Sequence, residues 1–353
     1  MIPALTDRAL NRATLARQYL LDRTDVPVLE AIEHLGGMQS QAPLAPYVGL
    51  WSRLSAFDPA VLSELMSRRE TVRTHLMRTT VHLVSARDCL DWHTLFQPRN
   101  AAAMTPNTAG LPPIDRTSLR TAAERLLRAS PRTRAELGRL LAASFVGADP
   151  GALAFAAAQE VAMCQVPPRG LWGRTGPAAW ALVEKWLGEA PRSTTPVSAV
   201  VLRGLGAFGP ATIADLQTWS GLTRLGEVVG ALSLRTFRSP AGPLLYDLPD
   251  APRPDEDTPA PPRFLPEYDN LLLSHRDRTR FIPSPRRVPL PPGNGATMGT
   301  YLLDGTWQGT WRLRGETLDV EPFTPPADPA PLLAEASRLA AFLGGSTARL
   351  LPT

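Results

Sequence analysis

The chain has 353 residues, of which 44% are hydrophobic and 20% are charged, and its formal net charge is +4. This length exceeds that of a usual single domain, and the composition is that of a folded globular protein rather than a disordered one. No run of 18 apolar residues occurs, and the first residues lack the apolar core of a signal peptide, so we expect neither a membrane span nor export.

Cysteine and histidine are sparse. The two cysteines, Cys89 and Cys164, stand far apart in the sequence and near no partner motif. This pattern is typical of a reducing cytoplasm, and it predicts neither a disulfide framework nor a thiolate metal site. The five histidines have no metal-ligand spacing, so we expect no metal and no cofactor.

The positive charge is carried by arginine, since Lys185 is the single lysine. Residues 1–140 hold 18 arginines against 13 acidic residues, whereas the remainder holds 19 basic residues, Lys185 included, against 20. An excess confined to one part is expected where a protein meets a polyanion. A GC-rich genome also favours arginine over lysine, so the arginine content alone does not show that the protein binds a polyanion.

The first predicted helix begins near residue 28. Thr24 or Asp25 can cap it, and its opening turn tolerates Pro27. Gly36-Gly37 stops it. Three apolar residues at helical spacing form its buried stripe: Val28, Ile32 and Leu35.

A second helix opens at Asp58-Pro59 and is followed by residues 74–84, which alternate with period two and predict one strand. Three arginines lie outside the apolar face of the helix: Arg68, Arg69 and Arg73. One face of the strand is polar and cationic: Arg78, Thr80 and His82. This is the order of a winged helix, in which the helix enters a DNA groove and the wing touches the backbone. A half-exposed strand with a solvated face gives the same pattern.

The same plan recurs twice, without strong likeness in sequence. Each copy has two helical stretches followed by a Gly/Pro-rich segment that resembles a hairpin. The helical stretches are residues 130–144 and 151–163 in one copy, and 209–222 and 223–232 in the other.

The C-terminal part has a different character. Residues 249–262 are polar and proline-rich, which predicts an exposed linker. Strand-like segments follow, broken by turns such as Asp304-Gly305, and they indicate a small antiparallel barrel or curved sheet. Residues 326–345 predict a closing amphipathic helix.

Three blocks of this sequence together resemble one family. They are "GGMQSQAPLAPYVGLWSRL" at 36–54, "HLMRTTVHLVSARD" at 75–88 and "PRFLPEYDNLLLSHRDR" at 262–278, supported by residues 302–313. The chain is similar to the bacterial winged-helix DNA glycosylases of the azinomycin-resistance type, which unhook interstrand crosslinks. The resemblance extends from about residue 5 to residue 345.

The resemblance implies an α+β fold with three tandem winged helices and a C-terminal small antiparallel β-barrel in one C-shaped chain, with DNA in the concavity. The corresponding division is residues 1–100, 101–192, 193–250 and 251–353. The implied activity is hydrolysis of the N-glycosidic bond of alkylated purines, chiefly N7-alkylguanine, including bulky or crosslinked adducts. The implied partner is double-stranded DNA, bound by a cytoplasmic, nucleoid-associated monomer in DNA repair or in self-resistance.

The catalytic motif of this family is Gln-x-Gln in one branch and Gln-x-Asp in the other. Here it falls on Gln39-Ser40-Gln41, so the resemblance implies the Gln-x-Gln branch, with both glutamines catalytic. Two residues that are two apart diverge on a helix but share a face in an extended segment, and Gly36-Gly37 and Pro43 favour the extended form. Each amide offers a donor and an acceptor, so the two can hold one water. An N7-alkylguanine already carries a positive charge and departs without protonation, so a neutral pair can suffice where other glycosidases use carboxylates.

The DNA-binding candidates are cations and backbone donors along the phosphates. Those in the first unit are Arg69, Arg73, Arg78, Thr80 and His82, and those in the barrel are His275, Arg276 and Arg278. Asp269 and Asn270 interrupt an apolar run, and they either brace the barrel against the first unit or belong to the site.

Two other functions stay open on the sequence alone. One is a DNA-binding regulator without catalysis, although such proteins commonly bind as symmetric dimers on palindromes. The other is a protein that sequesters adducted DNA without hydrolysing it. The release of a free base distinguishes the enzyme from both.

Overall fold

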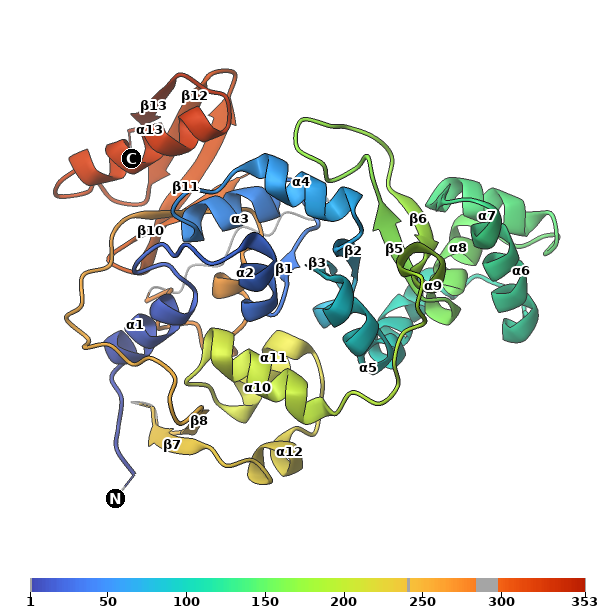
Figure 1. Cartoon of the computed structure of the whole chain (residues 1–353), viewed down its shortest axis with the longest axis horizontal. Coiled ribbons are helices and arrows are strands. Elements are labelled where there is room, and N and C mark those ends of the chain that lie inside the picture. Colours follow the sequence, from blue (N-terminus) through green and yellow to red (C-terminus); the bar gives the residue numbers. More distant parts are fainter. Residues whose placement is uncertain (1, 240–241, 284–297, 353) are drawn as a thin grey trace. The chain divides into compact units, whose positions relative to one another are not determined.

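The computed structural model describes residues 2–239, 242–283 and 298–352, and it combines helices and strands in a mixed α+β fold (Figure 1). Of the helices in these residues, none is long and apolar enough to cross a bilayer. The same residues contain no group of three or more His, Cys, Asp or Glu side chains placed to hold a metal ion.

The chain divides into two compact units. Unit 1 joins the N-terminal Met1–Phe57 to the C-terminal Val200–Thr353, and unit 2 is Asp58–Ala199. Unit 1 is therefore discontinuous in sequence. The four-part division drawn from the sequence stays a prediction.

The N-terminal part of unit 1 is helical around one short strand. Its elements are α1 (Asp7–Arg17), α2 (Val28–His34), β1 (Met38–Gln39) and α3 (Ala45–Arg53). Helix α2 ends where predicted, because Gly36 and Gly37 both adopt positive φ, at 67° and 83°. The predicted cap at Thr24 or Asp25 is wrong. Pro27 occupies the N-cap position and makes no side-chain cap. The φ angle that its ring fixes sets the start of the helix instead.

Unit 1 continues with three helices and a hairpin. These are α10 (Val197–Phe208), α11 (Ile213–Ser220), α12 (Gly226–Gly230), β7 (Arg235–Arg238) and β8 (Leu244–Asp247). Thr212 and Asp215 form a capping box that starts α11. The predicted helix over 209–222 and the hairpin after it are both present. The predicted exposed linker, 249–262, contains no helix or strand and is exposed or half-exposed throughout.

The C-terminal part of unit 1 is a five-stranded sheet covered by a helix. Its elements are β9 (Arg263–Leu265), η3 (Asn270–Leu272), β10 (Gly299–Leu303), β11 (Thr306–Arg314), β12 (Thr317–Pro322), α13 (Ala330–Phe342) and β13 (Thr347–Leu350). The strand order is β13-β12-β11-β10-β9, and all pairs are antiparallel except β12 with β13. The sequence predicted a small antiparallel barrel or a curved sheet. The strand order has two ends in the described residues, so the barrel is not confirmed. Helix α13 lies against this sheet (Figure 1). Three of its residues are fully buried in the core that they share with the strands: Leu332, Ala336 and Leu339.

Unit 2 opens with α4 (Pro59–Ser67), which Asp58 caps by accepting from Ala60 N, as predicted. The single strand predicted over 74–84 is wrong. The chain instead forms β2 (Thr71–His75), the 3₁₀ turn η1 (Met77–Thr79) and β3 (Val81–Ser85), paired as an antiparallel hairpin. Arg78 and Thr79 take positive φ values of 54° and 62°, which turn the chain through the middle of the alternating pattern.

The rest of unit 2 packs helices on this hairpin and a second one. Its elements are α5 (Ala86–Met104), η2 (Thr105–Thr108), α6 (Arg116–Ala129), β4 (Arg132–Thr133), α7 (Arg134–Ala142), α8 (Pro150–Glu160), β5 (Met163–Val166), β6 (Ala179–Leu182) and α9 (Val183–Leu187). Within unit 2 the strand order is β3-β2-β5-β6-β4. Caps set the helix starts, since Thr133 and Glu136 form a capping box for α7 and Asp149 caps α8. Leu119, Leu141 and Leu153 are fully buried in the core between these helices.

Candidate active site

The two glutamines of the predicted motif turn toward each other. Gly36 and Gly37 end α2, and the chain then runs extended through β1. In this segment Gln39 Nε2 donates to Gln41 Oε1 at 2.9 Å. Gln39 is 7% exposed and Gln41 is half-buried. The predicted geometry, in which both amides lie on one side, is therefore present.

Each amide has two N–H donors and an acceptor oxygen, so one mutual bond does not exhaust the pair. Within the described residues Gln41 makes only this hydrogen bond, which leaves its NH₂ group as a donor for a further partner. The pair thus combines a fixed position with an unused donor on Gln41, and each amide oxygen has two lone pairs with which to accept hydrogen bonds. Such a pair can orient a water molecule.

Behind β1 lies a small pocket in unit 1. Its cavity volume is about 20 Å³, which is room for about one water molecule. The lining residues that carry polar side chains are Gln18, Gln39, Arg53, Asp269 and Asn270. They come from α1, β1, α3 and the segment after β9, so the pocket joins both halves of the discontinuous unit.

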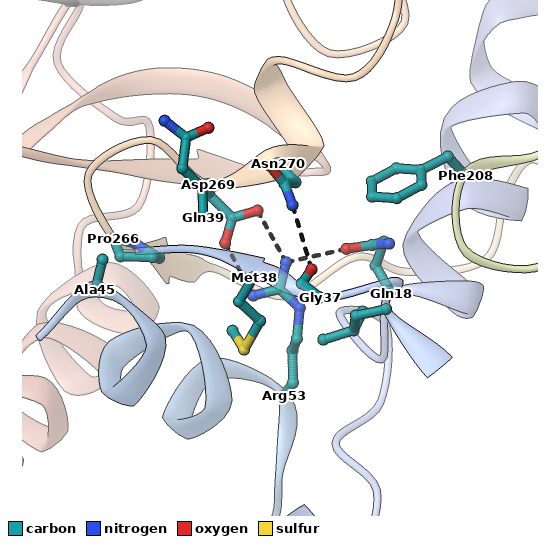
Figure 2. A pocket seen from close by; sticks show the side chains of 11 residues that line it. Gln18, Gly37, Met38, Gln39, Ala45, Arg53, Phe208, Pro266, Asp269 and Asn270 are labelled. Carbon is teal, nitrogen blue, oxygen red and sulfur yellow. Dashed lines mark hydrogen bonds and ion pairs between the residues drawn. The ribbon is translucent and has the colours of Figure 1, made fainter. Parts of the chain in front are cut away.

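A buried ion pair holds these segments together (Figure 2). Arg53, in the last turn of α3, donates from both terminal nitrogens to the carboxylate of Asp269, at 3.0 and 2.9 Å. The guanidinium also donates to Gly49 O at 3.0 Å and to Gln18 Oε1 at 3.1 Å. The Arg53 and Asp269 side chains are only 2% and 4% exposed. These contacts satisfy the two terminal nitrogens of Arg53, whereas its buried Nε has no hydrogen-bond partner among the described residues. A bidentate pair is the geometry in which a buried ion pair can repay its desolvation.

The neighbours of the ion pair reach the glutamine segment. Asn270 Nδ2 donates to Gly37 O at 3.3 Å, which ties the segment after β9 to the turn that precedes β1 (Figure 2). Gln18 caps the end of α1 and donates to Ala207 O at 2.7 Å. Asp269 also caps η3 through Leu271 N at 3.0 Å. Of the two roles that the sequence left open for Asp269 and Asn270, bracing is the one these contacts perform.

The sequence did not point to Arg53 or Gln18. Arg53 is a charged residue at the end of "APYVGLWSR", whose other residues are neutral, and that isolation in a buried helix was the available signal. Its partner lies 216 positions later in the chain, so no local pattern connects them.

Among the DNA-binding candidates of unit 2, only Arg69 is well exposed. Its guanidinium lies 4.3 Å from the centroid of the Trp186 ring and donates to Trp186 O at 3.1 Å. Arg78 and Thr80 are half-buried, and the Thr80 hydroxyl donates to Met77 O at 3.2 Å. Arg73 is 2% exposed.

The candidates of the C-terminal part of unit 1 also differ in exposure. Arg276 is exposed, and its backbone N–H donates to Asp215 at 2.8 Å. Arg278 is half-buried and donates to His275 O at 3.3 Å. His275 is fully buried, with Nε2 3.0 Å from Phe208 O.

Burial makes the histidine candidates neutral. Desolvation, together with the nearby Arg78, lowers the pKa of His82 from 6.5 to about 3. Desolvation and the nearby Arg280 lower the pKa of His275 to about 4. At neutral pH neither ring carries charge, and neither presents an exposed face for a phosphate. The exposed and half-buried arginines are the cations that remain for that contact.

Comparison with known proteins places this chain in a family. The family model described as "DNA glycosylase AlkZ-like" matches residues 32–342, so the chain belongs to the AlkZ-like DNA glycosylase family. Among solved structures, the DNA glycosylase AlkZ of Streptomyces sahachiroi is similar, with a TM-score of 0.75 and 20% identity over 99% of this chain and 100% of that one. At this identity the likeness shows the fold alone. None of the curated proteins matches the chain.

Replacing Asp269 tests the brace. Asp269→Asn keeps the shape and the cap of η3, but it leaves the buried Arg53 guanidinium facing a neutral amide. We expect the free energy of unfolding to fall by about 3 kcal/mol or more, measured by urea denaturation. The matched control is Glu64→Gln, which breaks the exposed Arg68–Glu64 pair and should change stability little. Equal stability of the two variants would contradict the assigned role.

The buried histidines predict a loss of stability in mild acid. His93, in α5, is buried, has no hydrogen-bond partner within the described residues, and has its pKa lowered by desolvation to about 4. Between pH 6.5 and pH 4 the unfolded chain binds more protons than the folded one, so the free energy of unfolding falls as pH falls.

His93→Leu removes this proton uptake with little change in volume. We expect it to preserve stability at pH 7 and to reduce the loss between pH 6.5 and pH 4 by up to about 3 kcal/mol. Urea denaturation over a pH series measures both quantities. An unchanged pH dependence would show that the site titrates near its ordinary value.

Proposed function

We propose that this chain hydrolyses the N-glycosidic bond of purines that alkylation has made cationic, chiefly N7-alkylguanine, in double-stranded DNA. The observation that carries the proposal is the hydrogen-bonded pair Gln39–Gln41 on a braced, extended segment. Membership in the AlkZ-like DNA glycosylase family supports the class of reaction. In this proposal the chain belongs to the Gln-x-Gln branch, with both glutamines catalytic.

The two amides act by position and dipole. Their oxygens accept from a water and turn its lone pair toward the anomeric carbon, while the same oxygens face the positive charge that develops on the sugar. The water adds to the anomeric carbon, the bond to the purine nitrogen breaks, and the bonding electrons neutralise the cationic base. The proton that the water loses passes to solvent. No covalent bond to the protein forms, so the enzyme is monofunctional.

Among the residues that the structure describes, one carboxylate lines the pocket, and it is not available for acid–base work. Asp269 is committed to Arg53 by two hydrogen bonds and to Leu271 N by a third. Protonating a neutral base would require a general acid, which glycosidases usually supply as a carboxylic acid. A cationic purine needs none. The site therefore favours substrates whose leaving group already carries the charge.

DNA binding is proposed to use winged helices. Two segments follow that order of helices and hairpin: α6–α8 with β5 and β6, and α10–α12 with β7 and β8. We propose a third winged helix within residues 1–100. Arg69, Arg78, Arg276 and Arg278 are the proposed phosphate contacts. The proposed substrates include bulky and crosslinked adducts, processed by a monomer in DNA repair or in self-resistance to alkylating compounds.

Removing both amides should stop base release without stopping DNA binding. For Gln39→Ala combined with Gln41→Ala, we expect single-turnover release of N7-methylguanine from a duplex to fall by about a hundredfold or more. The released base is measured by mass spectrometry, and binding by fluorescence anisotropy. Gln308→Ala, whose amide donates to Thr306 Oγ1 within the same strand, is the control expected to retain activity.

Undiminished release by the double variant would refute the catalytic pair. Tight binding of one particular DNA sequence, with no base released from any alkylated duplex, would instead favour the regulator.

The charge of the leaving base should decide whether it is released. We expect N7-methylguanine to be excised and the neutral O6-methylguanine to stay in the duplex at every pH at which the chain is folded, because the amides cannot protonate a base. Matched duplexes that differ in this one base give the measurement. Comparable release of both would show that a general acid operates, and the amide mechanism would be abandoned.

A further inference from the structure

The residues that follow the glutamine pair present an apolar surface. Leu44 is 44% exposed, and Ala42 and Pro43 are half-buried. From Ala45 onward the residues of α3 are buried up to Leu50. The large hydrophobic residues that are exposed in the described chain are few: Ile2, Leu44, Val61, Val146 and Leu202. Of these, Leu44 stands three positions from a proposed catalytic residue.

The backbone of Leu44 is held in place. Ala45 N donates to Ala42 O at 3.1 Å, and Tyr47 N donates to Leu44 O at 3.1 Å. Prolines at 43 and 46 restrict the φ angles on both sides. The first turn of α3 is thus anchored by its buried residues while the Leu44 side chain projects from it. An exposed leucine on a mobile loop would be unremarkable, but here a hydrogen-bonded turn carries it three residues after Gln41.

We propose that Leu44 is a positioning residue that inserts its side chain into the base stack beside the lesion. The inference rests on the proposed function, because it requires a duplex bound at the glutamine pair. Apolar side chains that enter a base step from the minor groove unstack it partly and kink the duplex. Opening one step exposes the glycosidic bond to the water held by Gln39 and Gln41. This wedge lets a bulky or crosslinked adduct react without full extrusion of the base.

The test replaces Leu44 with serine, which removes the apolar side chain from an exposed position. On a fully paired duplex with N7-methylguanine, we expect Leu44→Ser to lower the single-turnover rate about tenfold, since unstacking is no longer supported. On a duplex with a mismatch next to the lesion, where the step is already weakened, the rate should return to within about twofold of the parent. Leu44→Met should retain the parent rate on both.

A spectroscopic readout reports the wedge directly. 2-Aminopurine beside the lesion brightens when it unstacks, so the parent and Leu44→Met should raise its fluorescence on binding and Leu44→Ser should not. Leu202→Ser is the matched control, because Leu202 is 39% exposed on α10 of the same unit. It should behave as the parent in both assays.

The outcomes separate this inference from the function beneath it. Equal rates and equal fluorescence for the parent and Leu44→Ser would overturn the wedge while leaving the glycosylase intact. An equal loss on matched and mismatched duplexes would also overturn it, because the defect would then not concern stacking. A parent that releases no base from any duplex would overturn the proposed function itself.

Discussion

The structure around the glutamines depends on one buried ion pair. Arg53 and Asp269 are 216 positions apart in sequence, yet their bidentate contact fixes α3, the end of α1 through Gln18, and the segment after β9. Burying Arg53 or Asp269 without its partner would cost free energy, so the fold is stable only when the two side chains are paired. The strand that carries Gln39 is connected to this arrangement by the hydrogen bond from Asn270 Nδ2 to Gly37 O.

This brace also explains how uncharged groups can form a site. Among the described residues that line the pocket, the two charged ones, Arg53 and Asp269, are paired with each other, so neither lining charge is left free for a ligand. Gln39 lines the pocket, and its hydrogen bond to Gln41 restrains both amides. Preorganised dipoles of this kind are effective because they need not reorient when charge develops. The selectivity proposed for cationic purines has two causes. The ion pair engages the carboxylate of Asp269, which then cannot protonate a base, and the amides contribute only dipoles.

Local signals predicted those parts of the fold that local chemistry controls. Gly36-Gly37 ended α2 and Asp58 capped α4 as expected, since both depend on neighbouring residues. The alternation over 74–84 was misread, because period-two patterning continues through a tight hairpin and carries no mark of the positive φ at Arg78 and Thr79. Strand closure into a barrel depends on long-range pairing, and the described strands form an open order instead.

The site was predictable in part for the same reason. Gln39 and Gln41 are two residues apart, and the glycine turn before them and the proline after them predict an extended segment in which both amides lie on one side. The structure has this geometry, with a hydrogen bond between the two amides. Arg53 could not be assigned, since its partner is set by the tertiary fold. Nor could the sequence tell that His82 and His275 would be buried and neutral, because neither the alternating pattern around His82 nor the polar run around His275 shows whether the ring meets solvent or protein.

The discontinuity of unit 1 has a consequence for how the chain matures. During synthesis the segment Met1–Phe57 emerges first, and the whole of unit 2 follows before Val200 appears. Domains generally fold as units as they leave the ribosome, so unit 2 can assemble while the glutamine-bearing segment still lacks its carboxylate. The guanidinium of Arg53 then stays hydrated and without its ion-pair partner until Asp269 has been translated. Competence for chemistry is thus acquired late, and a nascent or truncated chain would carry both amides without the support that aims them.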